Sequence, residues 1–235
     1  MSQPRPISIL IATGNPHKAR EIVGVLSSRG TDFQSVRGGS DFQSGPVIEW
    51  KTLSEVSPPI PEPDEDGETF ADNAALKARY YLKATGLWTL ADDSGLEVDA
   101  LGGRPGVRSA RFAEDVAENA PRSVRDPANN RKLIALLRDI PPARRSARFR
   151  CALALADGQE ILATAEGTIE GVIVDEPRGE NGFGYDPHFF VPSLNQTLAE
   201  IGSEEKNRIS HRARALGVMC EHLRGIVKNS HQRPR

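Results

Sequence analysis

Two predicted helices begin with positive charge, which the positive end of a helix dipole disfavours. In the segment Thr13-Gly14-Asn15-Pro16-His17-Lys18, Asn15 is a suitable N-cap, Pro16 a suitable first residue, and Lys18 falls in the first turn. The last helix begins similarly, with Ser210 as the cap of Ser210-His211-Arg212. A cation there costs roughly 0.3–1 kcal/mol unless an anion lies between it and the exposed backbone N–H groups. The arrangement predicts phosphate binding.

A third cation, Lys77, lies on a face that otherwise points toward the core. Phe70, Ala74 and Tyr81 share this face at helical spacing. A buried ammonium group needs a partner. The alternative is a lysine whose stem packs while its charged end reaches water.

Carboxylates suited to a metal ion occur in two segments. Asp92 and Asp93 follow an apolar run, and successive strand side chains point to opposite faces, so one of the two is expected to face the site. An ordinary turn is the alternative for Asp92–Gly95. The acidic stretch Glu62–Asp66 could supply a second magnesium ligand or be a solvated loop.

An aromatic, glycine-rich loop could receive a flat ligand. Phe183-Gly184-Tyr185-Asp186 follows Asn181-Gly182, and stacking on Phe183 would hold a nucleobase. The alternative is a tight turn whose aromatic residues anchor it to the core. Lys206 would by default be a solvated helix residue.

Taken together, these residues describe a magnesium–nucleotide site. Lys18, Lys77, Lys206 and Arg212 would bind phosphates, the carboxylates a metal, and Phe183 a base. The chain lacks the GxxxxGK[ST] loop, a GxGxxG after a strand, HExxH and GxSxG. P-loop, dinucleotide, zinc-protease and serine-hydrolase chemistry are therefore not indicated.

The elements that must position these residues alternate between strands and helices. Apolar patterns predict helices that begin at Pro16, Phe70, Asp126-Pro127 and Ser210, and strands over 7–12, 87–91, 96–100, 149–155, 161–163 and 169–174, with a possible strand near 47–50. Asp92–Gly95 would separate two of the strands, and Asp157-Gly158 predicts a hairpin. The pattern is typical of an α/β protein with a mixed sheet.

Composition and length narrow the class of protein. We expect one domain over residues 7–228, an irregular insertion at 31–64 and a flexible tail at 229–235. A net charge of −2 argues against a general nucleic-acid surface. The apolar run Ile7–Ala12 is too short for a signal or membrane span, and Cys151 and Cys220 suggest buried thiols in a reducing compartment. A soluble, cytoplasmic protein that binds neither nucleic acid nor membrane is expected.

The motifs resemble the inosine triphosphate pyrophosphatase family, in the same order along the chain. They are Thr13-Gly14-Asn15 with Lys18, Gly67-Glu68-Thr69-Phe70 with Asn73 and Lys77, Ala91–Leu96, Gly103–Val107, Ser109-Ala110-Arg111, Phe183–Pro187, Ala199-Glu200, Lys206 and Ser210-His211-Arg212. The family implies hydrolysis of noncanonical purine nucleoside triphosphates to the monophosphate and pyrophosphate. It also implies magnesium dependence, a homodimer, and an elongated mixed sheet with flanking helices that forms two lobes around a central cleft.

The resemblance also implies roles for individual residues. Asp93 would be catalytic, beside Ser94, and would hold magnesium together with an upstream acid, for which Asp64 and Glu65 both fit. The substrate-binding residues would be Thr13, Gly14, Asn15, Pro16, His17, Lys18, Lys77, Ser94, Phe183, Gly184, Tyr185, Asp186, Lys206, His211 and Arg212.

Three competing functions are open at this point. A related pyrophosphatase would act on modified pyrimidine nucleotides, and a nucleotide-binding protein without catalysis would bind but not hydrolyse. An interaction protein would use the proline-rich segment Pro58–Pro63 as a ligand for a partner.

Overall fold

A long, twisted mixed sheet carries the structure, which is a computed structural model that describes residues 6–29, 48–113, 115–116, 120–158 and 160–230. The strand order is β2-β1-β3-β4-β5-β6-β7. The strands are β1 (Ile7–Ala12), β2 (Ile48–Thr52), β3 (Trp88–Val98), β4 (Ser146–Asp157), β5 (Glu160–Ile173), β6 (Phe189–Val191) and β7 (Gln196–Thr197). β1 pairs in parallel with β2 and β3, and the later pairs are antiparallel. The predicted α/β class with a mixed sheet is confirmed.

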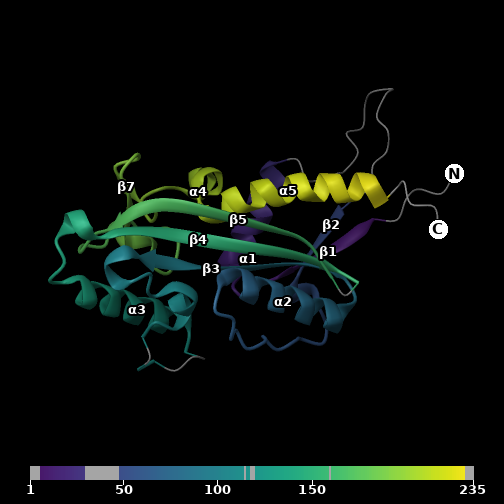
Figure 1. Ribbon diagram of the computed structural model, residues 1–235, viewed down its shortest axis with the longest axis horizontal. Helices are drawn as coiled ribbons and strands as arrows, with labels where there is room; N and C mark the ends of the chain where they lie inside the picture. The colour runs from purple at the N-terminus through teal and green to yellow at the C-terminus, as the bar shows by residue number, and fades with distance from the viewer. Residues whose placement is uncertain (1–5, 30–47, 114, 117–119, 159, 231–235) are drawn as a thin grey trace.

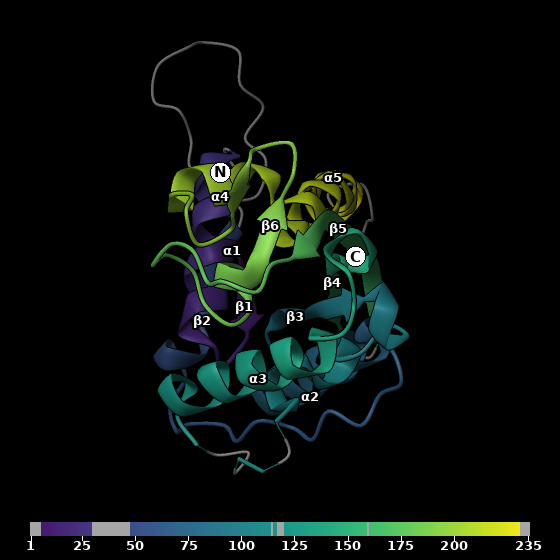
Figure 2. The same ribbon diagram turned by 90° about the vertical axis from the view of Figure 1, so that its left-hand side faces the viewer.

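Helices cover both faces of the sheet (Figures 1 and 2). The helices are α1 (Pro16–Ser28), α2 (Phe70–Thr85), α3 (Arg122–Leu137), α4 (Ser203–Ile209) and α5 (His211–Ser230), with short 3₁₀ helices η1 (Leu53–Glu55), η2 (Asp99–Leu101), η3 (Gly106–Arg111), η4 (Pro142–Arg144) and η5 (Asp186–His188). α1 and α5 pack with Ile9, Leu153 and Ala165 in one buried cluster. α2 packs on the opposite face against Ala91 and Ala154. Side chains that alternate along β3 therefore meet different helices.

A third buried cluster forms the other end of the elongated molecule (Figure 1). It joins Leu133 and Leu137 of α3 to Leu96 of β3, Phe149 of β4 and Phe189 of β6. The long strands β3 and β4 thus run through both ends and place their central residues between the two groups of helices.

Two predicted breaks in strands are absent, because β3 and β5 are each continuous. Asp92–Gly95 was expected as a turn but lies inside β3, where Asp92 pairs with Leu153 and Asp93 with Ala152. Cations on each face satisfy the two carboxylates, which outweighs the low strand propensity of aspartate. β5 likewise joins the predicted strands 161–163 and 169–174.

The start of α3 differs from the prediction, whereas two other starts agree with it. α3 begins at Arg122, so Pro127 lies inside the helix instead of opening it. The sequence interpretation was wrong because Asp-Pro is itself a good start signal. α1 begins after Asn15, and α2 after Thr69, as the capping residues predicted.

The predicted insertion and tail fall only partly within the described residues. Positions 31–47 and 231–235 lie outside them. The described part of the insertion holds β2, where a short strand was expected, and then η1. α5 extends to Ser230, into the predicted tail. In the described parts of the chain, no helix combines the length and apolar character needed to cross a membrane.

Candidate active site

The loop between β1 and α1 presents backbone and side-chain donors. Asn15 caps α1 by accepting a hydrogen bond from the backbone N–H of His17 at 3.0 Å, and Pro16 is the first helical residue. The Nδ2 of Asn15 is buried and has no partner among the described residues. Because a buried donor is costly when unpaired, this atom is suited to an anionic ligand.

Lys77 of α2 is buried between two carboxylates. Its Nζ lies 2.7 Å from Glu65 Oε1 and 3.3 Å from Asp93 Oδ1. Asn73, one turn earlier, donates from Nδ2 to Asp93 Oδ2 at 3.1 Å. The snorkelling alternative is thereby excluded, since the charged end of Lys77 turns inward to acidic partners. Glu65, and not its neighbour Asp64, makes this contact.

Asp92, which precedes Asp93 in β3, points to the opposite face of the sheet and contacts cations there. Asp92 Oδ2 lies 3.0 Å from Lys18 Nζ and 3.4 Å from Arg212 Nε. Arg212 also donates from Nη2 to Ser94 Oγ at 2.8 Å. Both predicted helix-start cations therefore meet at one buried carboxylate.

A second carboxylate pair continues this network toward the glycine-rich loop. Glu21 of α1 contacts Arg212 and lies 2.8 Å from Lys206 Nζ. Lys206 in turn lies 2.5 Å from Asp186 Oδ2 and is 5% exposed. Its default interpretation as a solvated residue was wrong, because Glu21 and Asp186 come from distant parts of the sequence. Positive and negative side chains therefore alternate through this network, from Asp92 of β3 through Arg212, Glu21 and Lys206 to Asp186 of η5.

The glycine-rich loop presents one aromatic ring and anchors another. Tyr185 is buried and donates from its hydroxyl to the backbone oxygen of Ser109 at 2.9 Å. Phe183 is half-buried, with Lys206 Nζ 4.8 Å from its ring centroid. Gly182 has a φ of 75°, and a Cβ there would overlap the Asp186 carboxylate. The anchoring alternative is therefore realised at Tyr185, and the half-buried ring of Phe183 stays open to a ligand.

These groups face one cavity of about 720 Å³. Its predicted lining residues are Thr13, Gly14, Asn15, Lys18, Asp64, Glu65, Lys77, Asp93, Ser94, Phe183, Gly184, Tyr185, Asp186, Lys206, His211 and Arg212. Pro16 does not line it, and His17 lies instead beside Phe183, with ring centroids 5.3 Å apart, in a neighbouring hollow of about 350 Å³. The structure thus brings together all but two of the predicted site residues.

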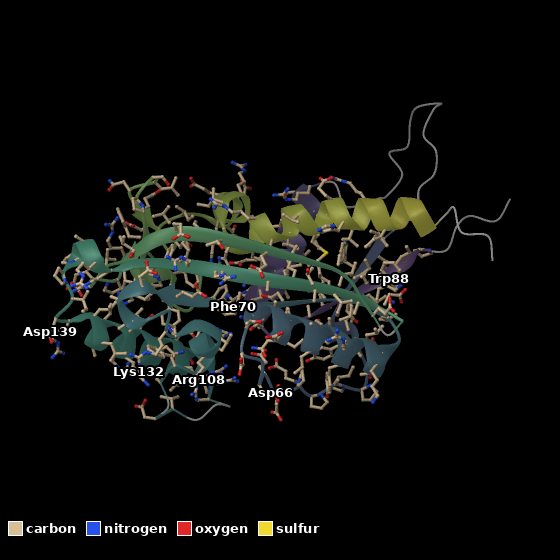
Figure 3. The ribbon with its side chains drawn as sticks, viewed as in Figure 1. Asp66, Phe70, Trp88, Arg108, Lys132 and Asp139 are labelled. Carbon is tan, nitrogen blue, oxygen red and sulfur yellow. The ribbon has the colours of Figure 1, made fainter. Side chains whose placement is uncertain are left out.

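Several lining residues were missed from the sequence. Outside the acidic stretch Glu62–Asp66 and the family motif that contains Arg111, the charged ones are Arg108, Arg122, Arg125 and Asp126. Figure 3 shows Asp66 and Arg108 on the side of the sheet where α2 and α3 lie, in the region between these helices. Arg122 and Arg125 were hidden by the late predicted start of α3. Glu21 could have been found from its position on the same helix face as Lys18, three residues away.

Burial and neighbouring charge give the two adjacent aspartates different acidities. Burial raises the pKa of Asp93, and Glu65 adds to this, while Lys77 and Lys18 oppose it. Burial acts on Asp92 in the same direction, but Lys18 and Arg212 outweigh it and hold its pKa well below the usual range. Asp93 is therefore the more basic carboxylate and the one suited to accept a proton from water.

His211 is a neutral, buried residue of the cavity. Its ring stacks on Phe149 at 5.0 Å with an interplanar angle of 13°. Burial, reinforced by Arg212 and Lys206, lowers its pKa well below the ordinary value. Its Nδ1 is buried and has no partner among the described residues, so it can meet a polar edge of a ligand.

Glu65 and Asp93 fit a magnesium ion. The two carboxylates share Lys77, so their oxygens lie near one another at the cavity wall. Magnesium usually takes one or two carboxylates and completes its shell with water and substrate phosphates. Within the described parts of the chain, no group of three or more His, Cys, Asp or Glu side chains could hold a metal. A pair of oxygen ligands open to the cavity suits that mode of binding.

Known proteins resemble this chain over nearly its whole length. The model of the Ham1 family matches residues 9–222. A dITP/XTP pyrophosphatase of Desulforamulus reducens is 45% identical over 217 residues, which cover 92% of this chain and 96% of the relative. The enzyme of the same name from Bacillus subtilis is 44% identical over 214 residues, which cover 91% of this chain and 96% of that enzyme.

Solved structures agree with these matches. A HAM1 protein from Coxiella burnetii has a TM-score of 0.74 at 37% identity and covers 93% of this chain and 99% of its own. A nucleoside-triphosphatase, or dITP/XTP pyrophosphatase, from Mycobacterium abscessus has a TM-score of 0.65 at 42% identity, covering 91% and 97%. The resemblance seen in the motifs is confirmed.

Proposed function

We propose that this chain, which belongs to the Ham1 family, hydrolyses noncanonical purine nucleoside triphosphates to the nucleoside monophosphate and pyrophosphate. The substrates are dITP, ITP and XTP. The observation that carries the proposal is the convergence of Lys18, Lys77, Lys206 and Arg212 on the cavity that Asp93 and Phe183 also line. Lys18, Lys77 and Arg212 correspond to a polyphosphate, Asp93 to a water nucleophile, and Phe183 with the adjacent Lys206 to a base.

Asp93 orients the attacking water and accepts its proton. The water oxygen bonds to the α-phosphorus, the bond from that phosphorus to the oxygen bridging to the β-phosphate breaks, and pyrophosphate leaves. Burial raises the pKa of Asp93, which strengthens it as a base, while Lys77 keeps it ionised before reaction. Asn73 donates to Asp93 Oδ2 at 3.1 Å, and Lys77 lies 3.3 Å from Asp93 Oδ1, so both carboxylate oxygens are held in place.

The cationic side chains bind and neutralise the triphosphate. Lys18 and Asn15 lie at the start of α1, where exposed backbone N–H groups add to their effect. Their ion pairs with buried carboxylates hold the cations in place before substrate arrives, so little reorganisation is needed during the reaction.

Magnesium is the proposed cofactor, held by Glu65 and Asp93. When bound, it would neutralise phosphate charge and orient the phosphates. The support is the pair of neighbouring oxygen ligands at the wall of the cavity.

We infer base selectivity from a ring platform that has a hydrogen-bond donor beside it. Lys206 Nζ, which can only donate, lies 4.8 Å from the Phe183 ring centroid, so it would be close to a purine stacked on that ring. A 6-keto oxygen accepts from such a donor, whereas the 6-amino group of adenine leaves it unpaired. The arrangement favours hypoxanthine and xanthine over adenine.

We also propose a homodimeric, cytoplasmic enzyme whose residues 7–228 form one domain, as the resemblance implies. Light scattering would give the mass in solution, to be compared with the 25.6 kDa of one chain.

A pyrophosphate-release assay with ITP, XTP, dITP, ATP, GTP and dTTP, with and without magnesium, tests the proposal. We expect release from ITP, XTP and dITP, in each case only when magnesium is present, and much less release from ATP. Binding without release would indicate a catalytically silent protein, and preference for dTTP would indicate a pyrimidine enzyme.

A further inference from the structure

Two arginines at the start of α3 line the cavity and have no role in the site described above. Arg122 and Arg125 are three residues apart in the first turns of the helix, so they share one face. The family motifs seen in the sequence do not include either residue. They bring positive charge to the cavity from α3, whereas Lys18 and Arg212 reach it from α1 and α5.

The charge of these arginines is poorly compensated. Arg122 Nη1 lies 3.6 Å from Asp126 Oδ1, longer than the roughly 2.7–2.9 Å of a charge-assisted hydrogen bond. The Nε of Arg125 is buried and has no partner among the described residues. By contrast, Lys18, Lys77, Lys206 and Arg212 each have a buried carboxylate within 3.4 Å.

Burial and repulsion both act against the charge of Arg122. Burial lowers its pKa, Asp126 opposes this, and Arg125 and Arg212 lower it further. The first turn of α3, Arg122-Ser123-Val124-Arg125, contains no acidic residue. Two like charges thus lie at the positive end of a helix dipole, and an anion brought between them would relieve the repulsion.

Arg122 lies in the electrostatic neighbourhood of the loop between β1 and α1, since it acts on His17 at the start of α1. Glu62 lies against Gly14 in that loop, since a Cβ added to Gly14 would overlap its carboxylate. The same carboxylate acts electrostatically on Arg122 and favours its charged form. Arg122 also lies 5.6 Å from the Phe183 ring centroid. Arg122 is therefore close to the ring platform and to an existing negative charge.

We propose that Arg122 and Arg125 bind the terminal phosphates of the substrate, and afterwards the pyrophosphate product, from the wall of the cavity that α3 forms. This inference rests on the proposed function. The ligand class is a polyphosphate, because a guanidinium group matches phosphate in charge and in bidentate geometry, whereas a neutral purine would leave the repulsion uncompensated.

The test compares binding of pyrophosphate and of inosine monophosphate by isothermal titration calorimetry in magnesium buffer. The proteins are the wild type, Arg122→Gln, Arg122→Gln/Arg125→Gln, and the control Arg131→Gln, which changes an exposed arginine of the same helix. We expect the double variant to bind pyrophosphate about 10-fold or more weakly, with monophosphate binding unchanged and the control like wild type. Lysine at both positions should restore part of the affinity because it keeps the charge.

Two results would overturn the inference. One is pyrophosphate affinity within twofold of wild type in the double variant, with thermal melting showing that it is folded. The other is loss of monophosphate binding with pyrophosphate binding kept, which would assign the arginines to the base. If the double variant does not fold, the pyrophosphate and monophosphate affinities of Arg122→Gln test the inference in the same way. Arginine-dependent pyrophosphate binding in a wild type that hydrolyses no nucleotide would refute the proposed function but leave this inference standing.

Discussion

Asp92 and Asp93 are adjacent in β3 but bind cations on opposite faces of the sheet. Asp92 contacts Lys18 on the α1 and α5 side, and Asp93 contacts Lys77 of α2. Because side chains alternate along a strand, one dipeptide can join two helical layers that the sheet separates. The strongly acidic Asp92 organises the cations, and the more basic Asp93 is left for chemistry.

Replacing Asp93 by asparagine should abolish most of the turnover with less effect on substrate binding. Asparagine keeps the shape but cannot accept the proton of water, so kcat for ITP should fall roughly 10²–10⁴-fold. Steady-state pyrophosphate release would measure this. Turnover near the wild-type value would show that Asp93 is not the base.

Glu65 and Asp64 should differ sharply in their contribution to magnesium binding. Glu65→Gln removes a carboxylate that shares Lys77 with Asp93, so the magnesium concentration for half-maximal activity should rise at least about 10-fold. Asp64→Asn is the matched control, because Asp64 is exposed, and it should change this concentration little. Equal effects of the two substitutions would contradict the assignment of the metal ligand to Glu65.

Glu21 should contribute stability that is lost in acid. Burial alone would raise its pKa, but Arg212 and Lys206 outweigh this and hold it below the ordinary value of 4.5. A lowered folded-state pKa stabilises the fold above the unfolded value, and the effect disappears as pH falls through the folded value. Glu21→Gln should therefore reduce the free energy of unfolding by about 3 kcal/mol at pH 7.

The measurement is urea unfolding of both proteins between pH 7 and pH 3. The difference between wild type and Glu21→Gln should shrink below pH 4.5. A difference that stays constant with pH would mean that the carboxylate charge of Glu21 does not stabilise the fold.

Gly167 should be required for the position of α5 on the sheet. A Cβ at Gly167 of β5 would overlap the backbone of His211 and Ala215, which cannot rotate away as a side chain could. Gly167→Ala should destabilise the protein by about 1–3 kcal/mol and lower activity, since His211 and Arg212 would shift with the helix.

Gly225→Ala serves as the control in α5. A Cβ there meets nothing within 4 Å in the described structure, and alanine favours helix by up to about 1 kcal/mol, so stability should rise slightly. Thermal melting and pyrophosphate release would be compared for both variants. A Gly167→Ala protein with the melting temperature and activity of wild type would show that α5 can be displaced without cost.

Local signals predicted helix starts where the capping residue and the first turn are adjacent in sequence. Asn15 and Thr69 cap α1 and α2 because each side chain bonds a backbone N–H two or three residues later. The same reasoning failed at α3, where Asp126-Pro127 imitates a helix start inside a helix that begins at Arg122. A helix whose start carries no capping side chain offers the sequence little to detect.

The residue types and motif order by themselves determined the α/β class and the family of this chain, together with Asp93, Phe183 and the four cations that line the cavity. The tertiary structure decided how those side chains are paired: Glu65 and not Asp64 meets Lys77, Glu21 joins Arg212 to Lys206, and Arg122 enters the cavity. Caps and periodicity act over a few residues, so they can be recognised in sequence. Ion pairs between segments up to 191 residues apart depend on the register of β3 and the docking of α5, which no local pattern encodes.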